Sequence, residues 1–410
     1  MSDIEYFWRL PTHGDGRQAH DKHTRGEWNR TPAALRKAPG QVHGEPDGFG
    51  YIDYLSQVAR AAEIAGFTGA LVPTGAISYQ SWTVAAALAR ETRRLRFLVA
   101  HQAGYTEPHF LAQTAATLQA ISGGRIDINW ITGGDSAAQR AIGDQLDHAR
   151  RYARTGELIE VVKGYWQSAP YSHHGELYRI DNGGLKSPLR EQPIPRTFLV
   201  GSSEPALAVS GAHADVYLVW AEPLEGNRQQ FEAARAAARS AGREDQMKFG
   251  VRVDIIARET DEEAWGEARR LHETATASTL KQFADLGREP RAPSTESAGA
   301  QRQWAMHQGY VGKSFDDLIV GPSLWAGFSL LRGGPSCGLI GSYSSIAERL
   351  AEYIDIGATH FVLASNPHLE EAWRVGEEVL PRVPAALQRL QELRSGSSRA
   401  PISIPEPASV

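Results

Sequence analysis

The stretch "TFLVGSSEPALAV", residues 197–209, contains a strand, a turn and the start of a helix in direct succession. The run 197–202 is apolar, as expected of a strand that is buried on both faces. A Gly-Ser-Ser turn follows, and Pro205 stands in the expected first helical turn, where the missing N–H of proline is tolerated. The stretch therefore predicts one βα unit of an α/β fold.

The same succession repeats along the chain. Apolar runs predict eight strands, at 4–10, 69–74, 95–101, 125–132, 197–202, 215–221, 248–257 and 360–365. Segments with apolar residues every three or four positions predict helices between them, at 51–65, 80–91, 107–121, 147–167, 204–212, 227–241, 261–276, 346–356 and 368–391. Eight such units fit a closed (β/α)8 TIM barrel. An open doubly wound sheet is the alternative, but the Gly-x-Gly-x-x-Gly turn typical of dinucleotide-binding folds does not follow the first strand.

Three segments interrupt the repeat. We expect a single domain over residues 1–393 with insertions at about 14–48, 168–196 and 277–345, followed by a Ser/Pro-rich tail at 394–410. The second insertion is expected to carry short strands of its own. The third contains "LLRGGPSCGLIGSY", whose glycines suggest a lid.

Composition narrows the functional class. The chain has 410 residues and a net charge of −5, so no surface for nucleic acid is indicated. No apolar run reaches the roughly 20 residues of a membrane-spanning helix, and the opening residues do not resemble a signal peptide. The single cysteine excludes an internal disulfide and suits the cytoplasm. We expect a cytoplasmic protein without nucleic-acid or membrane partners.

In a barrel, the residues that follow each strand converge on one face, where active sites lie. His13 and Asp15 follow the first strand, which explains a polar opening loop. The histidines are scattered without metal-ligand spacing, so no metal is predicted. No Gly-x-Ser-x-Gly nucleophile motif occurs, and Cys337 is expected to be a small apolar residue.

The turn at Ser202 and Ser203 is a candidate anion site, because free N–H groups and the helix dipole favour a phosphate there. A plain serine N-cap explains the same residues equally well. In "DHARRYARTGE", His148, Arg151 and Tyr152 could likewise hold a phosphate or form a solvated face.

Trp220, Arg252 and Arg332 form a second candidate set. Trp220 ends a strand, where it could wall a substrate pocket or simply lie at the rim of the core. Arg252 shares a strand face with Asp254, and a buried arginine is costly without an anion. These two residues could instead satisfy each other, or Arg9.

Seven pieces occur in an order that resembles the bacterial-luciferase-like flavin monooxygenases, and within them the alkanesulfonate monooxygenases. They are "FWRLPTHGDG", "GALVPTG", "AATLQAISGGRIDINWITGGD", "LVGSSEPA", "VYLVWAEP", "LWAGFSLLRGG" and "NPHLEEAWRVGE", spread from about Phe7 to Pro381. The resemblance implies a (β/α)8 barrel that takes reduced FMN from a separate NAD(P)H-dependent FMN reductase and uses O2 as co-substrate. It further implies cleavage of the C–S bond of a small anionic sulfonate, giving an aldehyde and sulfite, by a homodimer or homotetramer.

The resemblance also implies roles for individual residues. The flavin would contact Pro73, Thr74, Asn129 and Thr132, and its phosphate would contact Tyr152, Ser202 and Ser203. Trp220, Arg252 and the lid residue Arg332 would face the substrate, with His13 on the same catalytic face.

The chain departs from the alkanesulfonate pattern at four positions. Ser78 stands for a cysteine, Asp254 for a histidine, Asn366 for a tyrosine, and Arg9 for an apolar residue. A carboxylate at Asp254 would repel a sulfonate unless Arg9 neutralises it, or it reads a hydrogen-donating or positive group on another substrate. We hypothesise that Asp254 is a base, and that Arg9, Ser78 and Asn366 help to bind substrate. The alternatives are another organosulfur or non-sulfur substrate, a deazaflavin-dependent oxidoreductase, and a non-catalytic flavin-binding relative.

Overall fold

The computed structural model describes residues 4–12, 14, 51–75, 78–286, 297–308, 313–328 and 337–397. Eight parallel strands form a closed ring: β1 (Glu5–Arg9), β2 (Gly69–Val72), β3 (Arg96–Gln102), β4 (Ile126–Ile131), β7 (Thr197–Val200), β8 (Val216–Trp220), β9 (Lys248–Arg258) and β13 (Ala358–Ala364). The ring closes because β9 pairs with both β8 and β13, and β13 pairs with β1. The predicted (β/α)8 barrel is confirmed, and the open doubly wound sheet is wrong.

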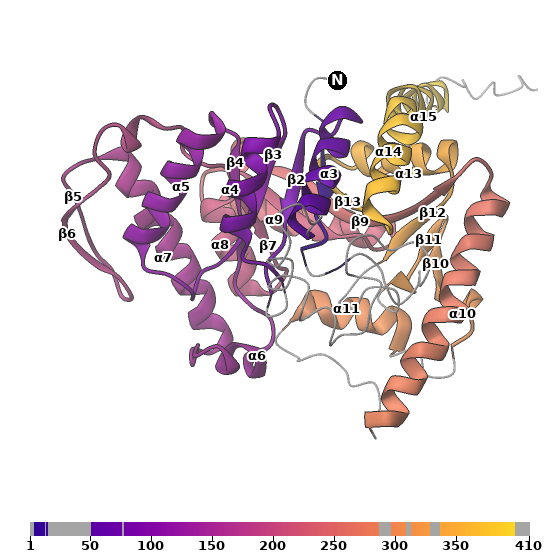
Figure 1. Ribbon diagram of the computed structural model, residues 1–410, viewed down its shortest axis with the longest axis horizontal. Coiled ribbons are helices and arrows are strands. Elements are labelled where there is room, and N and C mark those ends of the chain that lie inside the picture. Colours follow the sequence, from indigo (N-terminus) through magenta and orange to yellow (C-terminus); the bar gives the residue numbers. More distant parts are fainter. Residues whose placement is uncertain are drawn as a thin grey trace, which may run out of the picture.

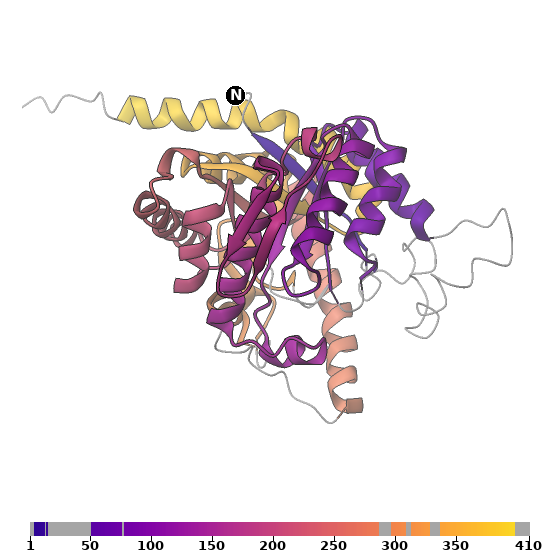
Figure 2. The same cartoon turned by 90° about the vertical axis from the view of Figure 1, so that its left-hand side faces the viewer.

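Helices surround the ring (Figures 1 and 2). They are α3 (Tyr51–Ile64), α4 (Ser81–Glu91), α5 (Pro108–Ser122), α7 (His148–Gln167), α8 (Glu204–His213), α9 (Leu224–Ser240), α10 (Asp261–Leu286), α13 (Tyr343–Asp355), α14 (His368–Arg374) and α15 (Val383–Ser397). Strand residues alternate between two cores: Trp8 packs outward against helices, whereas Phe7 joins an inner cluster that fills the barrel. In the described part of the chain, no helix is both long and apolar enough to cross a bilayer.

Ion pairs close the end of the barrel where the strands begin. The side chain of Asp127 is fully buried and its carboxylate lies 2.8 Å from both Arg96 and Arg196. Arg196 also pairs with Glu5 at 2.7 Å. Because these ion pairs fill the end where the strands begin, the opposite end, where the strands finish, is the end that can hold a ligand.

The third insertion carries secondary structure that the strand pattern did not predict. It contains α11 (Ala298–His307) and the strands β10 (Ile319–Gly321), β11 (Leu324–Trp325) and β12 (Gly338–Ser342). β12 pairs in parallel with the second half of β9, from Asp254 to Arg258. β9 therefore runs beyond the ring and supports the insertion. In Figure 1, α11 lies at the opposite end of the molecule from α15 and the N-terminal label.

Two other segments refine the expectations. The segment 168–196 contains the antiparallel hairpin of β5 (Tyr171–His174) and β6 (Arg179–Gly183). The single helix expected at 368–391 is interrupted by a π-helical segment, Val375–Val379, and a 3-10 turn, Leu380–Arg382. Pro381 has no N–H for the regular helical ladder, which accounts for the break. A short helix, α6 (Ser136–Ala141), was also not predicted.

Candidate active site

Two adjoining cavities occupy the end of the barrel where the strands finish. The barrel cavity, of about 280 Å³, is lined by Arg9, Pro73, Thr74, Asn129, Trp220 and Arg252 together with apolar strand residues. The outer cavity, of about 170 Å³, is lined by residues that include Thr132, His148, Tyr152, Ser202, Ser203 and Arg302. Both cavities are lined by Val200, Leu218 and Trp220, so they share one wall. The structure thus brings together most of the predicted site residues.

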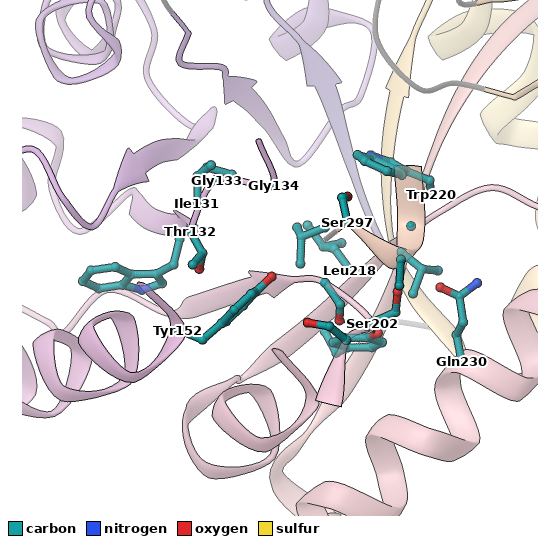
Figure 3. A pocket seen from close by; sticks show the side chains of 18 of the residues that line it. Ile131, Thr132, Gly133, Gly134, Tyr152, Ser202, Leu218, Trp220, Gln230 and Ser297 are labelled. Carbon is teal, nitrogen blue, oxygen red and sulfur yellow. Dashed lines mark hydrogen bonds between the residues drawn. The ribbon is translucent and has the colours of Figure 1, made fainter. Parts of the chain in front are cut away.

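Tyr152 and Ser203 meet in the outer cavity. In Figure 3, Thr132 and Tyr152 lie on one side of this cavity, and Trp220 and Gln230 lie on the other. Burial raises the pKa of Tyr152 to about 12, although the nearby Thr132 and Ser203 side chains and the charge of Arg151 lower the pKa in part. Tyr152 is therefore a neutral phenol that can donate a hydrogen bond. His148 Nε2 lies 3.1 Å from the Ser203 hydroxyl oxygen.

The start of α8 is built to receive an anion. Ser203 occupies the N-cap position, yet its side chain makes no capping hydrogen bond. By contrast, Ser342 caps α13 by accepting from the Ser345 N–H at 3.2 Å. The buried hydroxyl of Ser202 has no hydrogen-bond partner among the described residues. The missing capping bond argues against the explanation that Ser203 is a plain N-cap. The unpartnered hydroxyl of Ser202 favours an anion-binding site at this turn.

Gly201 is needed where β7 turns into α8. Its φ is 135°, and an added Cβ would collide with the Tyr152 hydroxyl. A side chain here would push Tyr152 out of the outer cavity, so glycine keeps the backbone close to that hydroxyl.

Two arginines, Arg9 and Arg252, line the barrel cavity, and among the residues that the structure describes no carboxylate lines it. The carbonyl oxygen of the Asn129 side chain is buried without a partner in the described part of the chain, so it can accept a hydrogen bond from a ligand.

Asp254 lies beside this cavity and not in its lining. It is 2% exposed and stands two residues after Arg252 on β9. Its N–H donates to the carbonyl of Cys337, and the thiol of Cys337 is itself buried against Gln303. Cys337 is thus a core residue, as expected.

Four further predicted residues, besides Asp254, fall outside both cavities or outside the described chain. Ser78 is half-buried in a turn, where its N–H donates to the Gly75 carbonyl at 3.1 Å. Asn366 is half-buried and precedes a cis peptide bond to Pro367. Neither lines the barrel cavity or the outer cavity. His13 and Arg332 lie outside the described residues.

Sequence reasoning missed the part of the site that comes from α11. Arg302 lines the outer cavity, and its Nε donates to the carboxylate of Glu222 at 3.0 Å. Its Nη2 donates to the side chain of Gln230 at 2.7 Å. Burial raises the pKa of Glu222, and the charge of Arg302 offsets part of that effect. Glu222 follows the end of β8, but nothing in the spacing of the chain shows that an insertion helix returns to it.

Comparisons with known proteins agree with this architecture. The family model described as luciferase-like monooxygenase matches residues 33–360. A structure of riboflavin lyase with modified FMN and substrate riboflavin superposes with a TM-score of 0.67 at 19% identity, covering 93% of this chain and 92% of that one.

Two further structures show the same fold. EDTA monooxygenase from Chelativorans sp. BNC1 gives a TM-score of 0.65 at 17% identity, covering 94% of each chain. A coenzyme F420-dependent tetrahydromethanopterin reductase from Methanopyrus kandleri gives 0.60 at 18% identity, covering 81% of this chain and 96% of that one.

Proposed function

The chain belongs to the luciferase-like monooxygenase family, and from this premise we propose that it is a two-component monooxygenase that uses reduced FMN and O2. We further propose that it oxidises a small anionic organosulfur compound, with cleavage of an organosulfonate to an aldehyde and sulfite as the leading reaction. The observation that carries the proposal is the uncapped start of α8, with the unpartnered Ser202 hydroxyl, beside a cavity lined by two arginines.

The residues present fit a flavin mononucleotide. Ser202, Ser203 and the first N–H groups of α8 would hold its phosphate, with Tyr152 donating a hydrogen bond. Asn129 would accept a hydrogen bond from the ring system in the barrel cavity. Reduced FMN, when bound, supplies the electrons that activate O2.

The substrate would lie in the barrel cavity. Arg252 is suited to a sulfonate, because its planar fork of donors matches an anion with several oxygens better than a lysine would. Leu71, Val200 and Leu218 present apolar surface to the same space, which would disfavour water there and limit the wasteful loss of activated oxygen. His13 and Arg332 remain predicted members of the site.

We also propose the partners that this chemistry requires. A separate NAD(P)H-dependent FMN reductase would supply the reduced flavin, and the enzyme would work in the cytoplasm as a homodimer or homotetramer. We propose an anionic substrate, because the two arginines of the barrel cavity would bind an anion better than a neutral alkane.

The first test is an anaerobic titration of the protein with reduced and oxidised FMN, followed by air and a panel of sulfonates with a sulfite assay. Tighter binding of reduced FMN together with sulfite release is the expected result. Tighter binding without sulfite would contradict the sulfonate substrate alone. If neither FMN form bound and F420 did, the deazaflavin alternative would replace the proposal. Binding without any turnover on organosulfur or other substrates would favour a non-catalytic relative.

Asp254→Asn tests the proposed base. The substitution keeps the size of the side chain, so the Kd of reduced FMN should stay within about twofold, while turnover should fall by about 100-fold or more if a proton acceptor is lost. The measurement is kcat for sulfite release at saturating substrate. Full activity in Asp254→Asn would mean that Asp254 accepts no proton.

A further inference from the structure

We propose that α11 sets the substrate range of the enzyme by positioning the ring of Trp220, with Gly299 and Arg302 as the positioning residues. This inference rests on the proposed function, since it assigns a role to a wall of that same site. It concerns residues of the third insertion, which lies outside the barrel ring.

Trp220 is the aromatic side chain that both cavities share. It is the last residue of β8 and lines the barrel cavity and the outer cavity together. Its backbone is held in place, because the Trp220 carbonyl accepts from the side chain of Asn227 at 2.9 Å. Within the described chain, its indole nitrogen makes no hydrogen bond, so the packing around the ring decides where the ring lies.

The backbone of α11 packs directly on that ring. A Cβ added to Gly299 would lie 3.2 Å from Cζ3 and 3.4 Å from Cε3 of Trp220. Contacts this short require the neighbour to move by a few tenths of an ångström. Glycine at 299 therefore lets the helix approach the ring as closely as it does, and any larger residue would push the ring toward the cavities.

Polar contacts fix α11 to the same segment that carries Trp220. Arg302 binds both carboxylate oxygens of Glu222, at 3.0 and 3.1 Å. Gln303 donates to the carbonyl of Ala221 at 3.1 Å. Ala221 and Glu222 directly follow Trp220 in the chain. The hydrogen bonds from α11 therefore reach the two residues next to the one that carries the ring.

The burial of Glu222 makes this connection strong. Glu222 is 5% exposed, and a carboxylate so deep in the protein needs a partner in fixed geometry. Arg302 is 37% exposed and supplies that partner from outside the ring. Changes in the insertion can therefore move the Trp220 ring while the barrel stays the same.

Gly299→Ala is the first test. Alanine favours helix by up to about 1 kcal/mol over glycine, which offsets the cost of moving the Trp220 ring, so the melting temperature should change little. With reduced FMN bound at saturation, the Kd of octanesulfonate should rise about tenfold more than that of ethanesulfonate, as expected when a pocket loses the space of a methylene group. The Kd of reduced FMN is measured beside it, because Gly299 also lines the outer cavity. Binding is measured by calorimetry and kcat/KM on the same protein. Gly266→Ala is the matched control, because a Cβ at exposed Gly266 in α10 meets nothing within 4 Å.

Arg302→Met is the second test, and it should act in the opposite direction. With α11 held less firmly, the Trp220 ring can move away from the cavities, so the ratio of the Kd of octanesulfonate to that of ethanesulfonate should fall below its value in the unaltered protein. More hydrogen peroxide should also be released per flavin oxidised. Arg302→Lys should bring the Kd ratio part of the way back to that of the unaltered protein. An unchanged length profile in Gly299→Ala and Arg302→Met, with flavin still bound, would overturn the role of α11. Failure of the unaltered protein to bind flavin would contradict the proposed function, and failure to bind any sulfonate would contradict both.

Discussion

At the scale of single residues, the outer cavity is defined by polar groups that do not complete their bonds within the chain. Ser203 stands at a helix start without capping it, and the neighbouring hydroxyl of Ser202 is buried without a partner among the described residues. An unsatisfied buried hydroxyl costs about 1–3 kcal/mol of stability. Such a cost is tolerated where a ligand removes it, which agrees with a phosphate at this position.

Ser202→Ala separates the two explanations of this turn. Removing a hydrogen bond to a charged group costs about 1.5–3 kcal/mol, so the Kd of reduced FMN should rise by about tenfold to 100-fold. The melting temperature should stay the same or rise, because no bond within the protein is lost. Anaerobic titration and thermal melts measure the two effects.

Ser342→Ala is the matched control for that prediction. Ser342 caps α13 and lies outside both cavities, so its loss should cost about 0.5–2 kcal/mol of stability without changing flavin affinity. Equal flavin affinity in Ser202→Ala and the unaltered protein would count against a phosphate at the start of α8.

At the scale of secondary-structure elements, the π-helical segment that follows α14 shows how closely the outer layer is packed. Gly376 lies in the π-helical segment between α14 and α15, and it is buried. An added Cβ would collide with the carbonyl oxygen of Ala65, just after α3. The space next to the Gly376 Cα accommodates a hydrogen atom but no methyl group. The Ala65 carbonyl oxygen belongs to the backbone, so it cannot move aside as a flexible side chain can.

Gly376→Ala should therefore destabilise the protein by about 1–3 kcal/mol, the usual cost of forcing extra atoms into a packed core. Urea unfolding followed by circular dichroism measures this change. Gly266→Ala is again the control, since that position in α10 is open and the substitution should be neutral or stabilising. If the two variants unfolded at the same urea concentration, the close approach of Gly376 to Ala65 would be wrong.

At the scale of the whole molecule, the ring of strands and the short strands of the segment 168–196 were predictable, whereas α11 and the strands of the third insertion were not. Each of the eight strands is an apolar run because helices cover one face and the barrel interior covers the other, so burial left a clear trace in the sequence. The rule that strand ends converge brought Arg9, Asn129 and Trp220 to the site. No such rule gives the position of α11, because a helix in an insertion does not directly follow a strand of the ring. Arg302 was missed for that reason.

The closed end of the barrel should govern acid stability. Burial alone raises the pKa of Asp127, but hydrogen bonds and charges from Arg196 and Arg96 outweigh it and hold the pKa below its ordinary value of 3.8. A lowered carboxyl pKa contributes stability that is present above pH 3.8 and is lost as the pH falls through the lower folded pKa. Asp127→Asn should cost about 2–3 kcal/mol at neutral pH, less than for a fully buried pair, because both guanidinium groups are partly exposed and Arg196 keeps its ion pair with Glu5.

This difference between Asp127→Asn and the unaltered protein should shrink below about pH 4, since the unaltered protein then loses the same interaction. Urea unfolding at several pH values measures it. Asp181→Asn is the control, because Asp181 is exposed on the β6 hairpin strand. A cost for Asp127→Asn that is constant with pH would show that the carboxylate charge is not what stabilises this end.

The pairing of β1 with β13 has a consequence for biosynthesis. Glu5 is aligned with His360, so about 350 residues must be made before the first strand meets its last neighbour. At roughly 5–20 residues per second on the ribosome, β1 waits roughly 20–70 s with one hydrogen-bonding edge open. An exposed strand edge invites pairing with other chains. The nascent protein should therefore depend on a chaperone during translation, and its yield should fall when the segment that carries β13 is synthesised slowly.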